Sequence, residues 1–324
     1  MLRDGYRRKV DYLRISVTDR CNLRCIYCLP ERGAVLKPAE DILTFEEIAW
    51  VAGLATRIGI NKIKITGGEP LVRRGLPKLI ELLSSIAGVT DISMTTNGVL
   101  LRENIKQLRD AGLKRVNVSI DTFKPEKFRF ITRFGNLEDV LSGIDAALAE
   151  NILVKLNAVI VKGINDDEIL RFIGFAQKKR IVVRFIELMP SMNNSVLIQN
   201  YYISCDEIKS KIEVLGGLKA IESENLGSGP ARYYTVEGSP TIVGFISPLS
   251  DKFCDSCNRV RLTADGFLMP CLSSQVRLDI KSYLRENRER EALDTLKKAV
   301  FLKPEGHEMT FSSRIPCSMS QIGG

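Results

Sequence analysis

The chain has 324 residues, 44% of them hydrophobic, so it is long enough for one large domain with an appendage and can bury a sizeable core. No apolar run approaches the ~20 residues that span a bilayer, and the basic start Met1–Lys9 lacks the apolar stretch of a signal peptide. The formal charge of +8 is typical of a solvated basic surface or of an anionic partner. No RNA-binding motif or long basic arm stands out, so if there is such a partner, a phosphorylated small molecule is favoured over nucleic acid. Eight cysteines without a sign of export point to metal binding or to reactive thiols, so we expect a reduced, cytoplasmic protein that does not associate with membranes.

Six short runs rich in Ile and Val, each bounded by polar residues or glycine, predict strands in chain order. They are Leu13–Val17, Lys62–Thr66, Asp91–Thr95, Arg115–Ile120, Val154–Ile160 and Val182–Ile186. Helical spacing fills the segments between them. Thr44-Phe45-Glu46-Glu47 is a capping box that opens a helix ending near Gly59, and the same pattern recurs in Leu76–Ile86, Glu103–Ala111, Leu137–Glu150 and Asp166–Lys178.

Six βα units predict parallel strands joined by right-handed crossovers, arranged as an open doubly wound sheet or as a barrel or partial barrel. In both architectures functional groups gather where strands end and loops begin. Polar motifs follow the predicted strands at Thr18–Cys28, Gly67–Pro70, Thr96–Gly98, Asp121–Thr122 and Glu187–Pro190.

The pattern changes after about residue 220. Gly227-Ser228-Gly229-Pro230 indicates a break, and strand-like segments follow around Tyr233–Val236 and Thr241–Ile246. A basic helical stretch, Val276–Val300, precedes a tail that ends in Gly323-Gly324. We therefore predict a first domain over residues 1–225 and a smaller module over residues 226–324 that closes the mouth of the barrel.

Three cysteines after the first strand are spaced Cys21-x3-Cys25-x2-Cys28. A cubane iron–sulfur cluster normally takes four cysteines, so three leave one iron open for chemistry. A structural zinc site would need a fourth ligand, and a disulfide would need an oxidising compartment. The loop resembles the signature of the radical S-adenosylmethionine (SAM) superfamily, in which the open iron chelates SAM. Gly67-Gly68-Glu69-Pro70, one unit later, resembles the motif of that superfamily that receives the amino group of SAM.

A second cysteine group, Cys254-x2-Cys257-x13-Cys271, also has three members and no histidine close by. A second cubane with an open iron explains this count, with zinc as the alternative. Beside it, alternation along a strand places Arg259 and Arg261 on one face, where two guanidinium groups suit a triphosphate. Further cations lie on other predicted strands, and a barrel lumen that buried several of them would need an anion to offset the charge.

The single histidine, His307, follows Pro304-Glu305-Gly306, and we expect it in a solvent-exposed loop. Zinc sites built on two or three histidines are excluded by this count.

Taken together, these motifs resemble the molybdenum cofactor biosynthesis protein A family, the GTP 3′,8-cyclases. The resemblance covers nearly the whole chain. It rests on Arg14–Cys28, Thr66–Pro70, Thr95–Gly98, Ser119–Asp121, Arg184–Pro190, the second cysteine group with Asn258-Arg259-Val260-Arg261, and the Gly-Gly end. It implies an incomplete (β/α)6 TIM-like barrel.

The resemblance also implies the site residues. Cys21, Cys25 and Cys28 would hold the cluster that binds SAM, and Cys254, Cys257 and Cys271 a second [4Fe-4S] cluster facing the guanine. The positions that match SAM contacts are Tyr27, Gly68, Ser119 and Met189. The positions that match GTP contacts are Arg14, Lys64, Thr95, Lys155, Arg259, Val260 and Arg261, with Lys62 and Arg184 as further basic positions of the pocket. Lys64 departs from the family, which usually has arginine at this position. The ammonium group of lysine carries a point charge, whereas the guanidinium of arginine can donate two parallel hydrogen bonds to a phosphate. Cys205 and Cys317 match no ligand position.

The reaction implied is that of a lyase. Cleavage of SAM gives a 5′-deoxyadenosyl radical that abstracts the 3′ hydrogen of GTP. C3′ then bonds to C8 of guanine, giving (8S)-3′,8-cyclo-7,8-dihydroguanosine 5′-triphosphate, the first step of molybdenum cofactor biosynthesis. The implied partners are a flavodoxin or ferredoxin as electron donor and a downstream cyclic pyranopterin monophosphate synthase, and we expect a monomer or homodimer. The alternatives are another radical SAM enzyme with an auxiliary cluster and a metal-binding protein that binds nucleic acid.

Overall fold

The computed structural model describes residues 2–191, 194–222, 226–313 and 319–322. Its centre is six parallel strands in sequence order, each paired with the next. They are β1 (Tyr12–Ser16), β2 (Lys62–Thr66), β3 (Asp91–Thr96), β4 (Arg115–Ser119), β5 (Leu153–Ile160) and β6 (Val182–Glu187). All six predicted strands are confirmed, with their ends shifted by no more than a residue or two.

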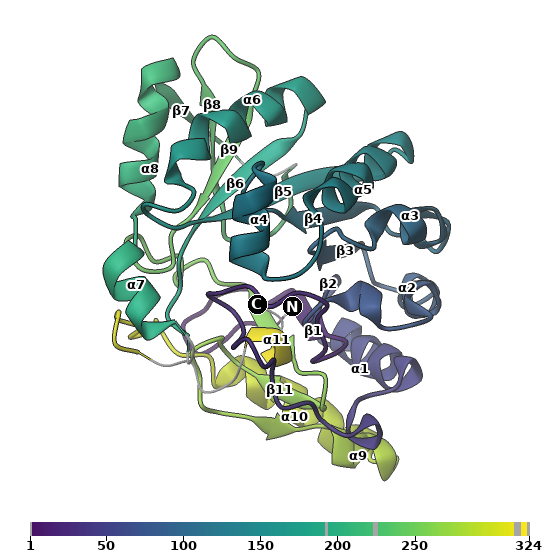
Figure 1. Cartoon of the computed structure of the whole chain (residues 1–324). Helices are drawn as coiled ribbons and strands as arrows, with labels where there is room; N and C mark the ends of the chain where they lie inside the picture. The colour runs from purple at the N-terminus through teal and green to yellow at the C-terminus, as the bar shows by residue number, and fades with distance from the viewer. Residues whose placement is uncertain (1, 192–193, 223–225, 314–318, 323–324) are drawn as a thin grey trace.

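Helices connect these strands along one side of the curved sheet (Figure 1). They are α1 (Phe45–Arg57), α2 (Leu76–Ser84), α3 (Leu101–Asp110), α4 (Pro125–Thr132), α5 (Leu137–Ala149) and α6 (Ile169–Lys179). After β6 come α7 (Ser195–Tyr201) and α8 (Cys205–Ile212). Single 3-10 turns lie at Ala39–Asp41, Pro70–Val72, Asp166–Glu168 and Glu213–Leu215. The helices predicted before β6 are confirmed, whereas α4, α7 and α8 were not predicted.

The carboxy-terminal strands extend the same sheet at both ends. On the β6 side, β9 (Ile242–Ile246) pairs with β6 in parallel, followed by β8 (Arg232–Val236) and β7 (Leu218–Ile221). On the β1 side, β10 (Arg259–Leu262) pairs with β1 in parallel, followed by β11 (Phe267–Met269) and β12 (Leu278–Asp279). The six central strands therefore form an incomplete barrel, as predicted, within a 12-stranded sheet.

The predicted boundary between residues 225 and 226 lies between two paired strands, β7 and β8. One hydrophobic cluster contains side chains from the central barrel and from β8 to β10 and α10. The predicted helical stretch Val276–Val300 is interrupted. It contains β12, α9 (Lys281–Arg285) and α10 (Glu289–Phe301), because Asn287 adopts a left-handed conformation with φ of 56° between the two helices. The last helix described is α11 (Met319–Ile322), which packs against β1. No helix in the described ranges is both long and apolar enough to span a bilayer.

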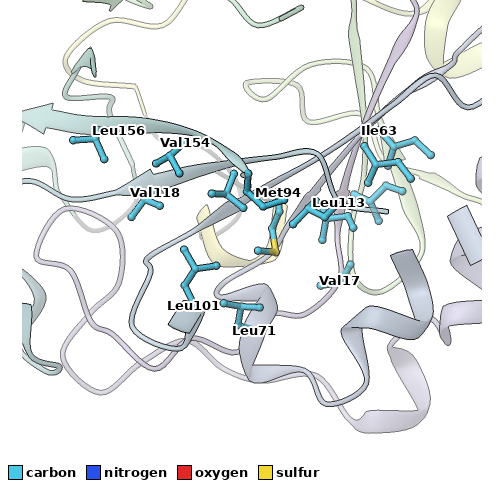
Figure 2. Close-up of a cluster of buried hydrophobic side chains, with 14 of the residues drawn as sticks. Val17, Ile63, Leu71, Met94, Leu101, Leu113, Val118, Val154 and Leu156 are labelled. Carbon is cyan, nitrogen blue, oxygen red and sulfur yellow. The ribbon is translucent and has the colours of Figure 1, made fainter. Parts of the chain in front are cut away.

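Strand alternation separates the core from the lumen of the barrel. Ile63 and Ile65 of β2 are at most 1% exposed and belong to the cluster of buried side chains shared by the strands and the helices. Figure 2 shows part of this cluster, including Ile63, Met94, Val118 and Leu156 from four neighbouring strands. Because side chains alternate between the two faces of a strand, Lys64 between these two isoleucines points the other way, into the barrel. The packing of the helices on the sheet thus fixes which side chains line the lumen.

The capping box at the start of α1 gives a test of local stability. Thr44 Oγ1 accepts the Glu47 amide at 3.1 Å, and Glu47 Oε2 accepts the Thr44 amide at 2.8 Å. Thr44→Ala should lower the free energy of unfolding by about 1 kcal/mol, because an amide at the helix start loses its acceptor. Thr44→Ser keeps the hydroxyl and should cost less than half as much. Urea titration of the two variants measures both, and equal losses would show that the cap is not the cause.

Candidate active site

The first cysteine group lies in the loop that follows β1. Cys21, Cys25 and Cys28 line a cavity of about 250 Å³ at the carboxyl ends of the strands. The backbone on either side of Cys25 is fixed to the end of α4, where the Arg24 amide donates to the Thr132 carbonyl and the Ile26 amide to the Ile131 carbonyl, both at 2.9 Å. The helix that sequence reasoning missed therefore holds the loop in place.

The donor set of this loop fits an iron–sulfur cluster. Burial, with the negative charges of the neighbouring Cys21 thiolate and Asp121, raises the pKa of Cys28 to about 12. Burial is also the main cause that raises the pKa of Cys21 to about 11. Three thiolates this close together are stabilised when each binds a cation. Within the described ranges no three His, Cys, Asp or Glu side chains converge on a single metal ion. A cubane has no such requirement, since each cysteine binds its own iron.

All four residues predicted to contact SAM line this first cavity: Tyr27, Gly68, Ser119 and Met189. The Tyr27 hydroxyl donates to Asp121 Oδ2 at 2.6 Å, which fixes the ring. The Gly68 amide donates to the Thr18 carbonyl at 2.9 Å and so ties the second motif to the loop after β1. The structure thus brings together residues from the loops after β1, β2 and β6 and from the end of β4.

Two buried carboxyl groups of the first cavity were not predicted as site residues. Burial raises the pKa of Glu69 to about 7, although Thr96 Oγ1 and the Asn97 amide each donate to it at 2.7 Å. Burial likewise raises the pKa of Asp121 to about 6 against the hydrogen bond from Tyr27. Their signal in the sequence was their position directly after a predicted strand.

A second cavity of about 180 Å³ adjoins the first, and the two share Thr95, Asn157, Ile186 and Met189 in their linings. It is lined by most of the predicted GTP-contacting cations and by the second cysteine group: Arg14, Lys64, Arg184, Arg259, Arg261, Cys254, Cys257 and Cys271. A ligand in one cavity would therefore lie next to a ligand in the other.

Three of the cations stand side by side on neighbouring strands. Arg14 of β1 is in register with Lys64 of β2 and with Arg261 of β10. Burial is the main cause that lowers the pKa of Arg14 to about 10. Tyr12 opposes this shift, and the charges of Arg259 and Arg184 add smaller decreases. Burial and the same kind of repulsion hold the pKa of Lys64 well below its usual range, and every charged neighbour responsible is a cation. Such a concentration of buried positive charge fits a polyanionic ligand.

The remaining predicted GTP contacts lie outside the lining of the second cavity. Lys155 is buried, donates to the Leu226 carbonyl and lies 5.4 Å from the centre of the Tyr233 ring. Val260 is fully buried in the hydrophobic core. Lys62 forms an ion pair with Asp11 at 3.0 Å.

The second cysteine group has cations as close neighbours. Lys303 Nζ lies 3.4 Å from Cys257 Sγ, and Arg259 Nη2 lies 3.5 Å from the same sulfur. Burial would raise the pKa of Cys257, but these two cations outweigh it and lower the pKa to about 6. Cys257 is thus favoured as the thiolate, which is the form that binds metal.

The other residues singled out from the sequence are placed as follows. Cys205 is buried beside the Ile246 carbonyl and lines neither cavity. Cys317 and the Gly323-Gly324 end lie outside the described residues. Just before that end, the Ile322 carbonyl accepts a hydrogen bond from Arg261 Nη1 at 3.1 Å. The prediction that His307 is exposed is wrong, because this side chain is 7% exposed and lines the second cavity.

Comparison with known proteins agrees with this geometry. The family model described as Radical SAM superfamily matches residues 15–176, and the one described as Molybdenum Cofactor Synthesis C matches residues 181–309. Among solved structures, Streptococcus suis SuiB bound to S-adenosylmethionine has a TM-score of 0.59 at 12% identity. That match covers 88% of this chain and 64% of SuiB and shows a shared fold.

A partial barrel with a three-cysteine loop after its first strand defines a radical SAM enzyme, a class that uses a [4Fe-4S] cluster and SAM. The GTP 3′,8-cyclase of Thermodesulfovibrio yellowstonii is 48% identical over 326 residues, and that of Moorella thermoacetica 47% identical over 325 residues. Both alignments cover 100% of this chain and 100% of the relative. The chain belongs to the GTP 3′,8-cyclase family.

The close approach of the two loops at Gly68 gives a test of the first cavity. A Cβ at Gly68 would lie 2.1 Å from the Arg20 carbonyl oxygen, whereas a Cβ at Gly53 in α1 would meet nothing within 4 Å. Gly68→Ala should therefore displace the cysteine loop, destabilise the fold by about 1–3 kcal/mol and abolish SAM binding. Gly53→Ala should stabilise the fold by about 0.5–1 kcal/mol and leave SAM binding intact. Calorimetry of SAM binding and thermal unfolding compare the two, and normal SAM binding by Gly68→Ala would contradict the assignment.

Proposed function

We propose that this chain catalyses the 3′,8-cyclisation of GTP, the reaction for which its full-length relatives are named. One observation carries the proposal. A cavity lined by a three-cysteine loop adjoins a cavity lined by buried cations and a second cysteine group, and the two share four lining residues. This arrangement suits a reaction in which a reactive group made in one cavity meets a triphosphate held in the other.

In the first cavity, Cys21, Cys25 and Cys28 hold a [4Fe-4S] cluster. With SAM bound, this cluster supplies a carbon-centred radical able to abstract hydrogen. The chain's own residues position SAM, with Tyr27 held by Asp121 and Gly68 allowing close approach of the backbone. Thr95 and Met189 line both cavities and so control the distance between SAM and the substrate. A near-attack separation of ~3–3.5 Å is what such positioning has to provide.

In the second cavity, the cations bind the triphosphate. Arg14, Lys64 and Arg261 lie in register on three adjacent strands, and Arg184 approaches from β6. A bound triphosphate offsets the charge that these side chains otherwise bury. The Arg184 guanidinium is oriented by donating from Nη2 to Asn117 Oδ1 at 2.5 Å. Lys155 of β5 is 7% exposed and lies outside this lining. Burial, and then the charge of Arg184, lower the pKa of Lys155 to about 7, so a triphosphate close by would favour its charged form.

Cys254, Cys257 and Cys271 would hold a second [4Fe-4S] cluster, which would supply an iron able to bind the guanine base. The cations beside Cys257 support a thiolate ligand set. Zinc is the alternative for this group, and metal analysis separates the two. About eight irons per chain and no zinc are expected of a protein with two cubanes.

The remaining partners follow from the reaction. Reduction of the first cluster requires a one-electron donor of the flavodoxin or ferredoxin type. The cyclised triphosphate is consumed by a cyclic pyranopterin monophosphate synthase. Neither a peptide-modifying radical SAM enzyme nor a nucleic-acid-binding protein is as well supported, because the full-length relatives carry the cyclase name and the cations lie inside a cavity.

Cysteine variants test the proposed roles of the two groups. Anaerobically reconstituted protein with SAM, a reductant and GTP should give 5′-deoxyadenosine and the cyclised triphosphate, both measured by chromatography and mass spectrometry. Cys25→Ser should give neither, because the first cluster is lost. Cys257→Ser should still cleave SAM but yield no cyclised product. Full turnover by Cys257→Ser would show that the second group has a structural role, and Cys205→Ser is the matched control with normal yield.

The lowered pKa of Lys64 predicts a pH dependence of GTP binding. In the free protein Lys64 loses its proton at a pH below the usual range for lysine. A bound triphosphate favours the charged form, so binding takes up a proton at any pH between the free and bound pKa values of Lys64. Affinity should therefore fall as the pH rises through that window, by up to tenfold per pH unit.

Lys64→Arg provides the control, because arginine stays protonated throughout. The GTP affinity of Lys64→Arg should depend less steeply on pH, because binding takes up one proton fewer than in the wild-type protein. Calorimetry in buffers of different ionisation enthalpy counts the protons directly, and the ionisation of the triphosphate itself is common to both proteins. Identical proton uptake by the two proteins would contradict the role of Lys64.

A further inference from the structure

His307, the single histidine of the chain, is the feature of the second cavity that the reaction described so far does not use. It lies on the segment after α10 and is 7% exposed. Nε2 is buried and has no hydrogen-bond partner within the residues that the structure describes. A buried polar atom is normally satisfied, so an unsatisfied one in the lining of a ligand cavity points to a ligand.

The surrounding contacts place His307 at the end of the cavity that holds the second cysteine group. A Cβ at the preceding Gly306 would lie 3.9 Å from Cys254 Sγ, so this segment runs directly against the cysteine. Arg8 holds the two together, since its guanidinium donates to the Cys254 carbonyl at 2.8 Å and to the Pro304 carbonyl at 2.6 Å. Lys252 Nζ donates to the His307 carbonyl at 3.0 Å. The imidazole is therefore held in a fixed position.

The hydrogen bonding of the ring determines its tautomer. The Met309 amide donates to Nδ1 at 3.3 Å, so Nδ1 is an acceptor and carries no proton. Burial, and then the Lys252 ammonium, lower the pKa of His307, while the Pro248 carbonyl opposes the shift in part. The ring is therefore neutral, and a neutral ring that accepts at Nδ1 carries its proton on Nε2. Nε2–H is therefore a buried hydrogen-bond donor without a partner among the described residues, on a side chain that lines the cavity.

We propose that His307 recognises the base of the nucleotide by donating from Nε2–H to an acceptor on guanine, O6 or N7. This inference rests on the proposed function, which places GTP in the second cavity with its base toward the second cysteine group. Guanine presents O6 and N7 as acceptors on one edge, whereas adenine has an amino group in place of O6. A donor fixed by the protein rejects a ligand that leaves it unsatisfied.

The test compares the dissociation constants of GTP and of two nucleotide analogues for the wild-type protein and for variants at His307, as in a double-mutant cycle. Reconstituted protein without reductant, so that no turnover occurs, is titrated with GTP, with 2-aminopurine riboside triphosphate, which lacks O6, and with 7-deaza-GTP, which lacks N7. His307→Leu removes the donor, and His307→Gln keeps a side-chain N–H near the position of Nε2.

The wild-type protein should bind one of the two analogues about 10- to 100-fold more weakly than GTP. His307→Leu should bind GTP more weakly by a similar factor and show little further loss with that analogue. The affinity for the other analogue, relative to GTP, should fall by the same factor in the wild-type protein and in His307→Leu. The atom that this analogue lacks does not take part in the hydrogen bond with His307. His307→Gln should recover part of the affinity. The analogue that couples with His307 identifies the acceptor as O6 or N7.

The inference would be overturned if, for both analogues, the loss of affinity caused by His307→Leu were the same as the loss that it causes for GTP. A purely structural role of His307 gives no coupling with a particular atom of the base. The iron content and the thermal unfolding of each variant check that the second cysteine group has bound its metal.

Failure of the role of His307 and failure of the proposed function give different results. If the wild-type protein binds and cyclises GTP but shows no coupling, the role of His307 alone is wrong; if it neither binds nor cyclises GTP, the proposed function is wrong.

Discussion

The constraint on which the site depends is the burial of positive charge inside the barrel. Arg14, Lys64 and Arg261 are fixed in register on three adjacent parallel strands, and the isoleucines that alternate with Lys64 pack against the helices. None of these three cations can turn outward without exposing the core, because the period of a strand is two residues. The strand pairing that stabilises the fold therefore also creates an anion-binding lumen. Without a ligand, the fold buries positive charges close together at a cost in free energy, and binding of an anion offsets that cost.

The central part of this fold follows from local patterns, and so it could be predicted. Each of the strands from β1 to β6 is a short β-branched run, and the capping box at Thr44 forms both of its hydrogen bonds. The placement of β9 beside β6 and of β10 beside β1 could not be predicted. Those pairings join segments far apart in the sequence, and no local pattern records which edge of an open barrel a later strand will extend. Ser204 and Glu207 also form a capping box, so α8 had a signal that sequence reasoning passed over.

The site shows the same division between local and long-range information. The cysteine loops and the residues after the strand ends were found because their spacing is local, and they line the two cavities. His307 was misplaced because a Pro- and Gly-flanked segment is usually exposed, whereas Arg8, nearly 300 positions earlier, holds this one against Cys254. The role predicted for Lys62 stays a prediction. Alternation groups it with Lys64, but at the start of β2 it is close enough to Asp11 to form an ion pair outside the lining of the second cavity.

The two cysteine groups differ in the charge that surrounds them, and this difference has a chemical consequence. The first group has Asp121 and Glu69 as charged neighbours that raise thiol pKa values, whereas Arg259 and Lys303 lie beside Cys257 in the second. Hydrogen bonds and positive charge near the sulfurs favour the reduced state of an iron–sulfur cluster. If both groups held cubanes, the residues beside the second group would favour its reduced state more than those beside the first. Cys254, Cys257 and Cys271 would then hold a cluster suited to binding the base, whereas Cys21, Cys25 and Cys28 would hold the one that supplies strongly reducing chemistry to SAM.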